Sequence, residues 1–182
     1  HSEWRQSVDL ARQQTKRRLG LTAASHSRLL YFKCALDNLN LSSETETALH
    51  LERTYWGEFV RSMRKRPGVD RFFQRAREAN IPVFILTDLT TEIQIRKLYH
   101  LNVLDFTSGV ITSEEAGQDK PSDEFVDLIK SKVGTLDKHW WIIGDDEAKD
   151  GGVASKLPSS EFFLLNSNES ATFFNKQTTL ID

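Results

Sequence analysis

Apolar residues recur every three or four positions over the first third of the chain, which is the spacing of amphipathic helices. One face of a first predicted helix is marked by Trp4, Val8, Ala11, Thr15 and Leu19. A second helix is expected over residues 29–39, and a third should begin after the capping pair Ser42-Ser43 and run to Met63. Residues 1–66 are therefore predicted to form a small helical domain.

The periodicity changes at Pro67-Gly68, after which helical and strand-like segments alternate. Helices are predicted over 69–79, 91–101 and 121–133, and strands over 81–87, 109–112, 140–144 and 162–165. The first and third of these strands are continuously apolar, as is typical of parallel sheets covered by helices on both faces. The fold class predicted for residues 67–182 is therefore α/β, a doubly wound, Rossmann-like parallel sheet. Such sheets bind ligands at the carboxyl ends of their strands.

Composition excludes several classes of protein. The chain is 38% hydrophobic and 27% charged, and it contains no run of the roughly 20 apolar residues that a membrane span needs. With 24 Lys and Arg against 26 Asp and Glu, it has no general attraction to nucleic acid or to anionic lipid. The single cysteine, Cys34, excludes an intramolecular disulfide. A cytoplasmic protein with a small-molecule partner is expected, whereas its oligomeric state is not predictable.

The first candidate site lies where the strand at 81–87 ends in Thr87-Asp88. A hydroxyl beside the first free amides of the next helix is well placed to bind a phosphate oxygen. The alternative is that Thr87 only caps that helix.

The second candidate is Lys120, which precedes Pro121 at the start of a predicted helix. Positive charge is unfavourable at the positive end of a helix, so the lysine is explained if its ammonium group faces a carboxylate or a phosphoryl group. An exposed lysine on a loop is the alternative.

The third candidate is an acidic cluster after the strand at 140–144, formed by Asp145, Asp146 and Asp150. Carboxylates at a strand end suit Mg²⁺, which takes one or two protein carboxylates together with water and phosphate oxygens. A solvated acidic turn is the alternative. A hydroxyl, a cation and a carboxylate group at three strand ends together predict a phosphate site.

The order of these motifs resembles the haloacid dehalogenase superfamily, in particular its phosphatase-like members with a helical cap inserted after the first strand. The matching segments are Arg66-Pro67-Gly68-Val69 with the strand up to Asp88, then residues 112–117 leading to Lys120-Pro121, and Gly144-Asp145 with Asp150 five residues later. The resemblance implies that Thr87 and Lys120 are catalytic and bind phosphate beside Asp88. It implies that Asp145 binds Mg²⁺, with Asp146 and Asp150 as further candidate metal residues, and that Asp150 either supports the metal or orients Lys120.

The chain departs from the family at its first motif, a strand followed by Asp-x-Asp. In the family, the first carboxylate attacks phosphorus and the second acts as general acid and base. No Asp-x-Asp occurs here, and the chain begins at His1 with Met63 as its only methionine. Omission of the motif ahead of His1 is one explanation, and a degenerate family member is the other. The family places this strand in the middle of the sheet, so a sheet without it should expose two apolar edges. The gap between these edges should be filled by the missing strand, by another segment or by a partner.

These observations predict a Mg²⁺-dependent phosphatase of a small phosphorylated metabolite that works through an aspartyl-phosphate, with residues 1–66 as its cap. Two alternatives remain open. One is a catalytically inactive binding or regulatory protein of the same fold. The other is a 2-haloacid dehalogenase, which keeps the nucleophile but needs no Mg²⁺, so the cluster around Asp145 argues against it.

Overall fold

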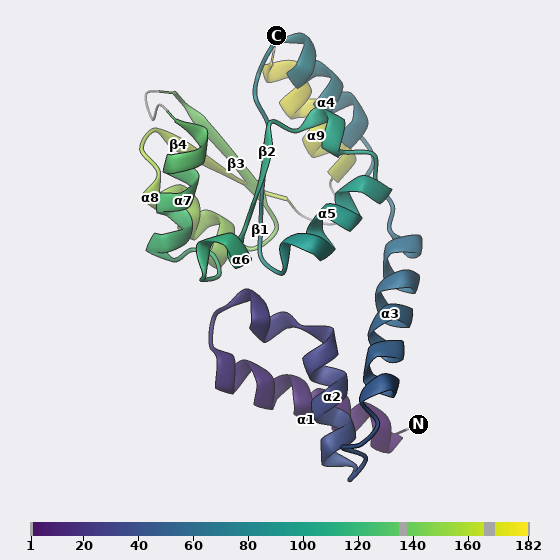
Figure 1. Ribbon diagram of the computed structural model, residues 1–182. Coiled ribbons are helices and arrows are strands. Elements are labelled where there is room, and N and C mark those ends of the chain that lie inside the picture. The colour runs from purple at the N-terminus through teal and green to yellow at the C-terminus, as the bar shows by residue number, and fades with distance from the viewer. Residues whose placement is uncertain (1, 135–137, 166–169, 182) are drawn as a thin grey trace.

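In the computed structural model, which describes residues 2–134, 138–165 and 170–181, the chain has a helical N-terminal half and an α/β C-terminal half (Figure 1). The helical half contains α1 (Ser2–Leu19), the short 3-10 helix η1 (Ala23–His26), α2 (Arg28–Asn38) and α3 (Thr45–Ser62). The three predicted helices are thus confirmed. The capping prediction is wrong, because Glu44 is the N-cap of α3 and the Ser42-Ser43 pair lies in the preceding turn.

Apolar packing between helices holds this half together. Phe32 and Leu36 of α2 are buried with Ala48 of α3, and partly buried Trp4, Val8, Leu51 and Tyr55 pack around them. The hydroxyl of Ser7 donates a hydrogen bond of 2.9 Å to the carbonyl of Ala35, which joins α1 to α2. The predicted apolar face of α1 is therefore the face that packs on α2.

The α/β half alternates helices and parallel strands, as predicted. Its elements are α4 (Val69–Glu78), β1 (Phe84–Thr87), α5 (Thr91–His100), η2 (Leu104–Phe106), β2 (Gly109–Thr112), α6 (Ser113–Ala116), α7 (Asp123–Val133), β3 (Trp140–Gly144), the π-helix η3 (Glu147–Gly151), α8 (Gly152–Lys156), β4 (Ser160–Leu164) and α9 (Ser170–Leu180). No helix in the described ranges is long and apolar enough to span a membrane.

The described strands form two parallel pairs, where the sequence predicted one doubly wound sheet. β1 pairs with β2, and β3 pairs with β4. Between β1 and β3 lies an apolar cleft of about 740 Å³, lined by residues 83–86 and 140–143 and by side chains of α4, α7 and α9. Each pair therefore has an edge along this cleft whose backbone groups lack a strand partner among the described residues, so the sheet is interrupted there.

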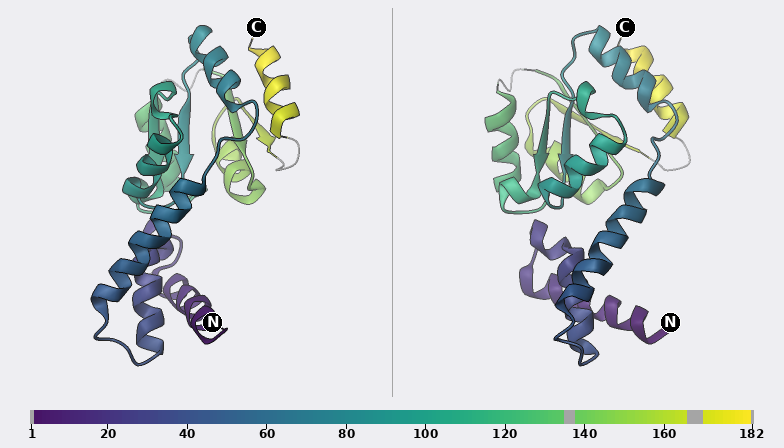
Figure 2. Two further views of the ribbon diagram at one scale, coloured as in Figure 1. Left: turned by 90° about the vertical axis from the view of Figure 1, so that its right-hand side faces the viewer. Right: turned by 45° about the vertical axis from the view of Figure 1, so that its right-hand side comes forward.

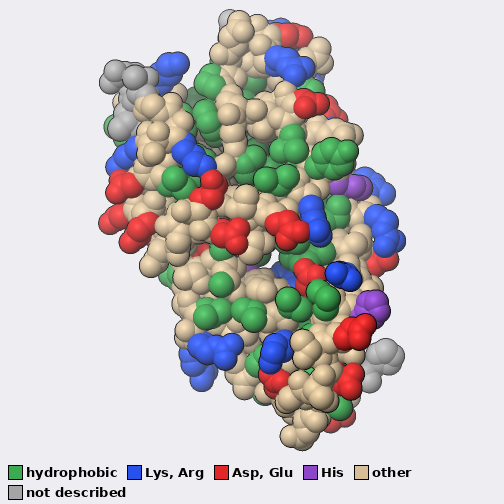
Figure 3. Space-filling view, in the orientation of Figure 1, with side chains coloured by type: hydrophobic (Ala, Val, Ile, Leu, Met, Phe, Trp, Pro, Cys, Tyr) green, Lys and Arg blue, Asp and Glu red, His purple; other side chains and the backbone are tan. Residues whose placement is uncertain are grey.

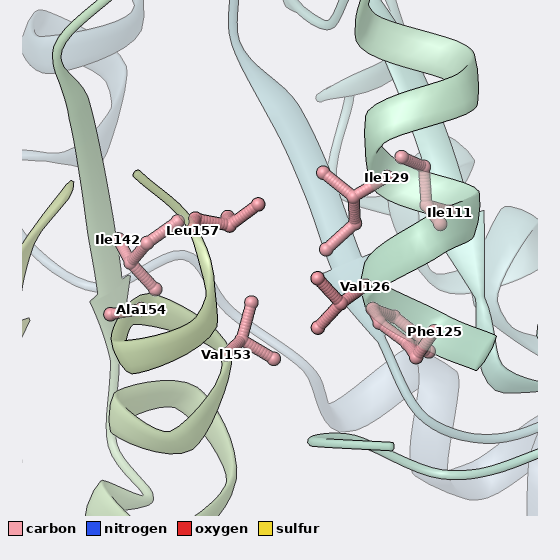
Figure 4. Packing of buried hydrophobic residues seen from close by; sticks show 8 residues of the cluster. All are labelled: Ile111, Phe125, Val126, Ile129, Ile142, Val153, Ala154 and Leu157. Carbon is pink, nitrogen blue, oxygen red and sulfur yellow. The ribbon is translucent and has the colours of Figure 1, made fainter. Parts of the chain in front are cut away.

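The main core bridges the two strand pairs. Its buried side chains are Ile111, Phe125, Val126, Ile129, Ile142, Val153, Ala154 and Leu157, and Figure 4 shows those of α7 facing those of α8. Fully burying each large aliphatic or aromatic side chain stabilises the fold by roughly 1.5–3 kcal/mol. This core therefore fixes the relative positions of β1 and β3 although the two strands are not paired.

The helical half lies at the end of the α/β half where β1 terminates, as the views in Figures 1 and 2 agree. Figure 3 shows the surface hollowed between the two halves. Direct contacts join them beside the predicted site, where the amide of Asp119 donates a hydrogen bond of 2.9 Å to the carbonyl of Leu21. The division into a cap of 1–66 and a core of 67–182 remains a prediction.

Candidate active site

The carboxyl end of β1 provides the first part of the site. The Thr87 hydroxyl donates to the carbonyl of Asp88 at 3.1 Å. The N-cap of α5 is Thr90, so the alternative in which Thr87 caps that helix is wrong. Leu89, which follows, has a φ of 92°, a conformation that is a true outlier for a bulky residue and that clusters at functional sites.

Asp88 connects β1 to the two other strand-end segments. One carboxylate oxygen accepts the backbone amide of Lys120 at 3.0 Å, and the other accepts the ammonium group of Lys149 at 2.6 Å. Burial alone would lower the pKa of Lys149, but its hydrogen bond to Asp88 and the charges of Asp88, Asp119 and Asp146 outweigh burial and raise that pKa. The Asp88 carboxylate thus holds two cationic segments in place, and its predicted phosphate-binding role stays a prediction.

Lys120 is almost buried between β1 and β3. Its ammonium group donates to Asp150 at 2.6 Å and to the carbonyl of Leu86 at 3.2 Å. The Lys120 and Asp150 side chains are 10% and 12% exposed. The alternative of an exposed loop lysine is therefore wrong. A buried lysine held by a carboxylate at a strand end has a fixed ammonium group that is ready to meet a phosphate oxygen.

The three predicted metal ligands have three different surroundings. Asp145 is exposed and lies 3.6 Å from the guanidinium group of Arg66. Asp146 accepts the amide of Lys149 and so caps η3. Asp150 accepts the Lys120 ammonium and the amide of Asp146. Of the two roles suggested for Asp150, the one that its contacts match is orienting Lys120.

The described residues contain no group of three or more His, Cys, Asp or Glu side chains arranged to hold a metal. Asp145 nevertheless has the chemistry of a Mg²⁺ ligand, because its exposed carboxylate follows the carboxyl end of β3, the end of the strands at which Lys120 also lies. Mg²⁺ needs only one or two protein carboxylates when phosphate and water complete its shell. These residues thus support one ligand, and a second carboxylate would have to come from elsewhere.

Glycine is required at two positions around the Lys120–Asp150 pair. A Cβ atom on Gly144 would lie 2.1 Å from the Asp150 carboxylate, and a Cβ atom on Gly152 would lie 2.7 Å from the ring of Pro121. Both separations are far below van der Waals contact. Gly144 therefore lets the Asp150 side chain lie against the end of β3, and Gly152 lets α8 approach Pro121, the residue after Lys120.

Sequence reasoning missed a contact between the helical half and this loop. The ring of His26 in η1 lies 2.7 Å from the carboxylate of Asp119, whose side chain is 1% exposed. Burial alone would raise the pKa of Asp119, but the hydrogen bond and charge of His26 and the charge of Lys149 outweigh it and lower that pKa. The two residues are 93 positions apart, so no local pattern could have revealed the contact.

The lowered pKa of Asp119 predicts a pH-dependent contribution to stability. The unfolded chain binds this proton more tightly than the folded chain, so the contribution is complete above the ordinary aspartate pKa of about 3.9 and is lost as the pH falls through the lower folded value. Asp119→Asn should lower the free energy of unfolding by about 1–3 kcal/mol at pH 7. Urea unfolding of the wild type and of Asp119→Asn at pH 7 and at pH 3 would measure this difference in the free energy of unfolding. The control is Asp9→Asn, on the exposed surface of α1. A difference that does not shrink at pH 3 would contradict the assignment.

Comparisons with known proteins identify the family to which the chain belongs. The model of the family described as haloacid dehalogenase-like hydrolase matches residues 10–157. The chain belongs to this family. It is also 34% identical over 170 residues to a protein of Halopiger xanaduensis named ribulose-1,5-bisphosphate 5-phosphatase, a match that covers 93% of this chain and 71% of that relative. The resemblance to this family noted in the sequence is therefore confirmed.

Proposed function

We propose that this haloacid dehalogenase-like protein is a Mg²⁺-dependent phosphatase of a small phosphorylated metabolite. The observation that carries the proposal is the buried Lys120–Asp150 pair at the ends of β1 and β3, beside Thr87. Lys120 and the Thr87 hydroxyl would bind oxygens of the transferring phosphoryl group, where fixed donors stabilise developing negative charge. The name of the relative supports phosphatase chemistry and suggests ribulose 1,5-bisphosphate as the first substrate to test.

The nucleophile would be an aspartate on a further strand inserted in the cleft between β1 and β3. The unpaired strand edges and the apolar lining of the cleft support this placement. The aspartate oxygen would form a bond to phosphorus while the ester P–O bond breaks, and the leaving alkoxide would take a proton from a second acid. Water would then hydrolyse the aspartyl-phosphate and release inorganic phosphate.

The residues of this chain would hold the phosphate and its charges in place. Asp150 keeps the Lys120 ammonium at the strand ends, and Asp88 fixes the Lys120 backbone and the Lys149 ammonium. Mg²⁺, when bound, supplies further neutralisation of the phosphoryl oxygens, and Asp145 would hold it. Residues 1–66 would act as the cap that excludes water from the reaction.

The experiment that tests the proposal has two parts. Intact mass and N-terminal sequencing of the protein from its native source would show whether Asp-x-Asp precedes His1. Phosphate release from ribulose 1,5-bisphosphate by that protein, with Mg²⁺ and with EDTA, would then test the activity. Hydrolysis that stops with EDTA is the expected result. A native protein without the motif and without hydrolysis would instead favour the inactive binding protein.

Asp145→Asn should lower kcat/KM at least about 100-fold and weaken Mg²⁺ binding, because the amide removes the negative charge that the metal needs. Mg²⁺ titrations of activity would show whether excess metal partly restores the rate. The control is Asp127→Asn on the exposed surface of α7, which should leave the rate unchanged. An unaltered Mg²⁺ requirement in Asp145→Asn would remove Asp145 from the metal site.

A further inference from the structure

Three basic side chains, those of Arg12, Lys16 and Arg28, lie on the helices α1 and α2, which pack against each other. Arg12 and Lys16 lie one turn apart on α1, so their side chains are neighbours on one helix face. Arg28 is the first residue of α2. The pKa of Lys16 is lowered by burial and then by the charges of Arg12, Lys149 and Arg28. Cations from α1, α2 and the phosphate side of the core therefore lie within electrostatic range of one another.

The position of Arg28 is fixed by its contacts. Its guanidinium group lies 5.3–5.4 Å from the ring centroids of Tyr31, Tyr55 and Trp56, and it donates to the His26 carbonyl at 2.8 Å. His26 in turn contacts Asp119, the residue before Lys120. Arg28 is thus tied through His26 to the loop that carries the candidate catalytic lysine, and aromatic stacking keeps its charge in place.

In the described part of the chain, cationic neighbours outweigh anionic ones around Lys16, because the charges of Arg12, Lys149 and Arg28 lower its pKa while the charge of Asp119 raises it. No carboxylate there lies within ion-pair distance of Arg12, Lys16 or Arg28. The neighbouring acids are already engaged, because Asp119 contacts His26 and Asp88 holds Lys149. Like charges held together in this way cost free energy unless an anion lies between them.

We propose that Arg12, Lys16 and Arg28 form a binding site for a second phosphate group, so that the substrate is a bisphosphate. The inference rests on the proposed function, because the first phosphate is the one bound at Lys120. Figure 3 shows a hollow between the helical half, which carries Arg12, Lys16 and Arg28, and the α/β half, which carries Lys120. Two separated phosphates would then match two separated groups of cations, and a monophosphate would leave the second group without a ligand.

Calorimetric titration of the full protein with ribulose 1,5-bisphosphate and with ribulose 5-phosphate tests the proposal. The wild type should bind the bisphosphate at least about tenfold more tightly, since charge-assisted hydrogen bonds to the second phosphate add to the first. Arg12→Ala and Lys16→Ala should each weaken bisphosphate binding about tenfold and change monophosphate binding less than about twofold. Arg18→Ala, an exposed position on the same helix, is the matched control and should change neither.

The outcomes separate this inference from the proposed function. Lys120→Ala should weaken the binding of both ligands. If it does so while Arg12→Ala and Lys16→Ala change the binding of both ligands equally or not at all, the second phosphate site is wrong and the phosphatase proposal stands. A wild type that binds neither ligand contradicts both. Because Arg28 also packs against the aromatic rings, thermal melts should accompany any Arg28 variant, and the two α1 variants carry the test.

Discussion

Replacement of Lys120 by alanine is expected to lower kcat/KM at least about 1,000-fold and to destabilise the fold. The catalytic loss follows because the Lys120 ammonium is fixed by the Leu86 carbonyl of β1 and by Asp150 of η3, and fixed charge is usually a large contribution to phosphoryl transfer. The structural loss follows because Asp150, 12% exposed and 2.6 Å from the Lys120 ammonium, would keep an uncompensated charge, which typically costs about 3–5 kcal/mol.

A second variant separates these two effects of Lys120. Lys120→Met combined with Asp150→Asn removes both charges, so it should recover much of the free energy of unfolding while activity stays lost. Lys130→Ala, whose ion pair with Asp127 is on the surface, should change neither property. Urea unfolding and steady-state kinetics of the four proteins give the answer, and activity in the double variant close to wild type would refute a catalytic Lys120.

Gly144→Ala is expected to have the second large effect, although it adds a single methyl group. That carbon would lie 2.1 Å from an oxygen and 2.3 Å from the Cγ atom of the Asp150 carboxylate. Asp150 must therefore move, which breaks its contacts with Lys120 and with the amide of Asp146. We expect a loss of about 3 kcal/mol or more in the free energy of unfolding and at least a 100-fold loss in kcat/KM.

Gly57→Ala is the matched control for this substitution. Gly57 lies inside α3, and an added Cβ atom would meet only the end of the Arg61 side chain, at 3.5 Å. Alanine is the better helix former, so a gain of about 0.5–1 kcal/mol is expected. Comparable stability losses in the two variants would show that the contact with Asp150 is not what requires glycine at position 144.

The cleft between β1 and β3 links the fold to the proposed chemistry. α7 and α8 keep the two strand pairs at a fixed separation through the shared core, so a strand that enters the cleft would find backbone partners on both sides. Its carboxyl end would then lie between the ends of β1 and β3, beside Lys120. The same feature that interrupts the sheet therefore gives the nucleophile its expected place.

Local sequence patterns were sufficient for the elements and for much of the site. Helical spacing over residues 1–66 predicted α1, α2 and α3, and the change at Pro67-Gly68 predicted the α/β half. Lys120 was identified because a positive charge before a helix needs an anionic partner, and the structure supplies Asp150. These features were predictable because periodicity and helix-end electrostatics act over a few residues.

The precise ends of elements and the uses of individual carboxylates were less predictable. The pair Ser42-Ser43 resembles an N-cap for α3, but the N-cap is Glu44 and the helix begins at Thr45. The sequence predicts Asp146 as a metal residue, and the structure shows in addition that its carboxylate caps η3. Short polar side chains serve equally well in caps, turns and ligand shells, and only their neighbours decide among these uses.

By itself the sequence determined the order of helices and parallel strands, the candidate residues at the strand ends and the family. The tertiary structure alone decided that the described strands form two pairs separated by a cleft, that His26 contacts Asp119, and that Asp88 holds Lys149. The physical reason is distance along the chain. Each of these features joins segments many residues apart, and such contacts depend on how the helices and sheets pack rather than on any local preference of the sequence.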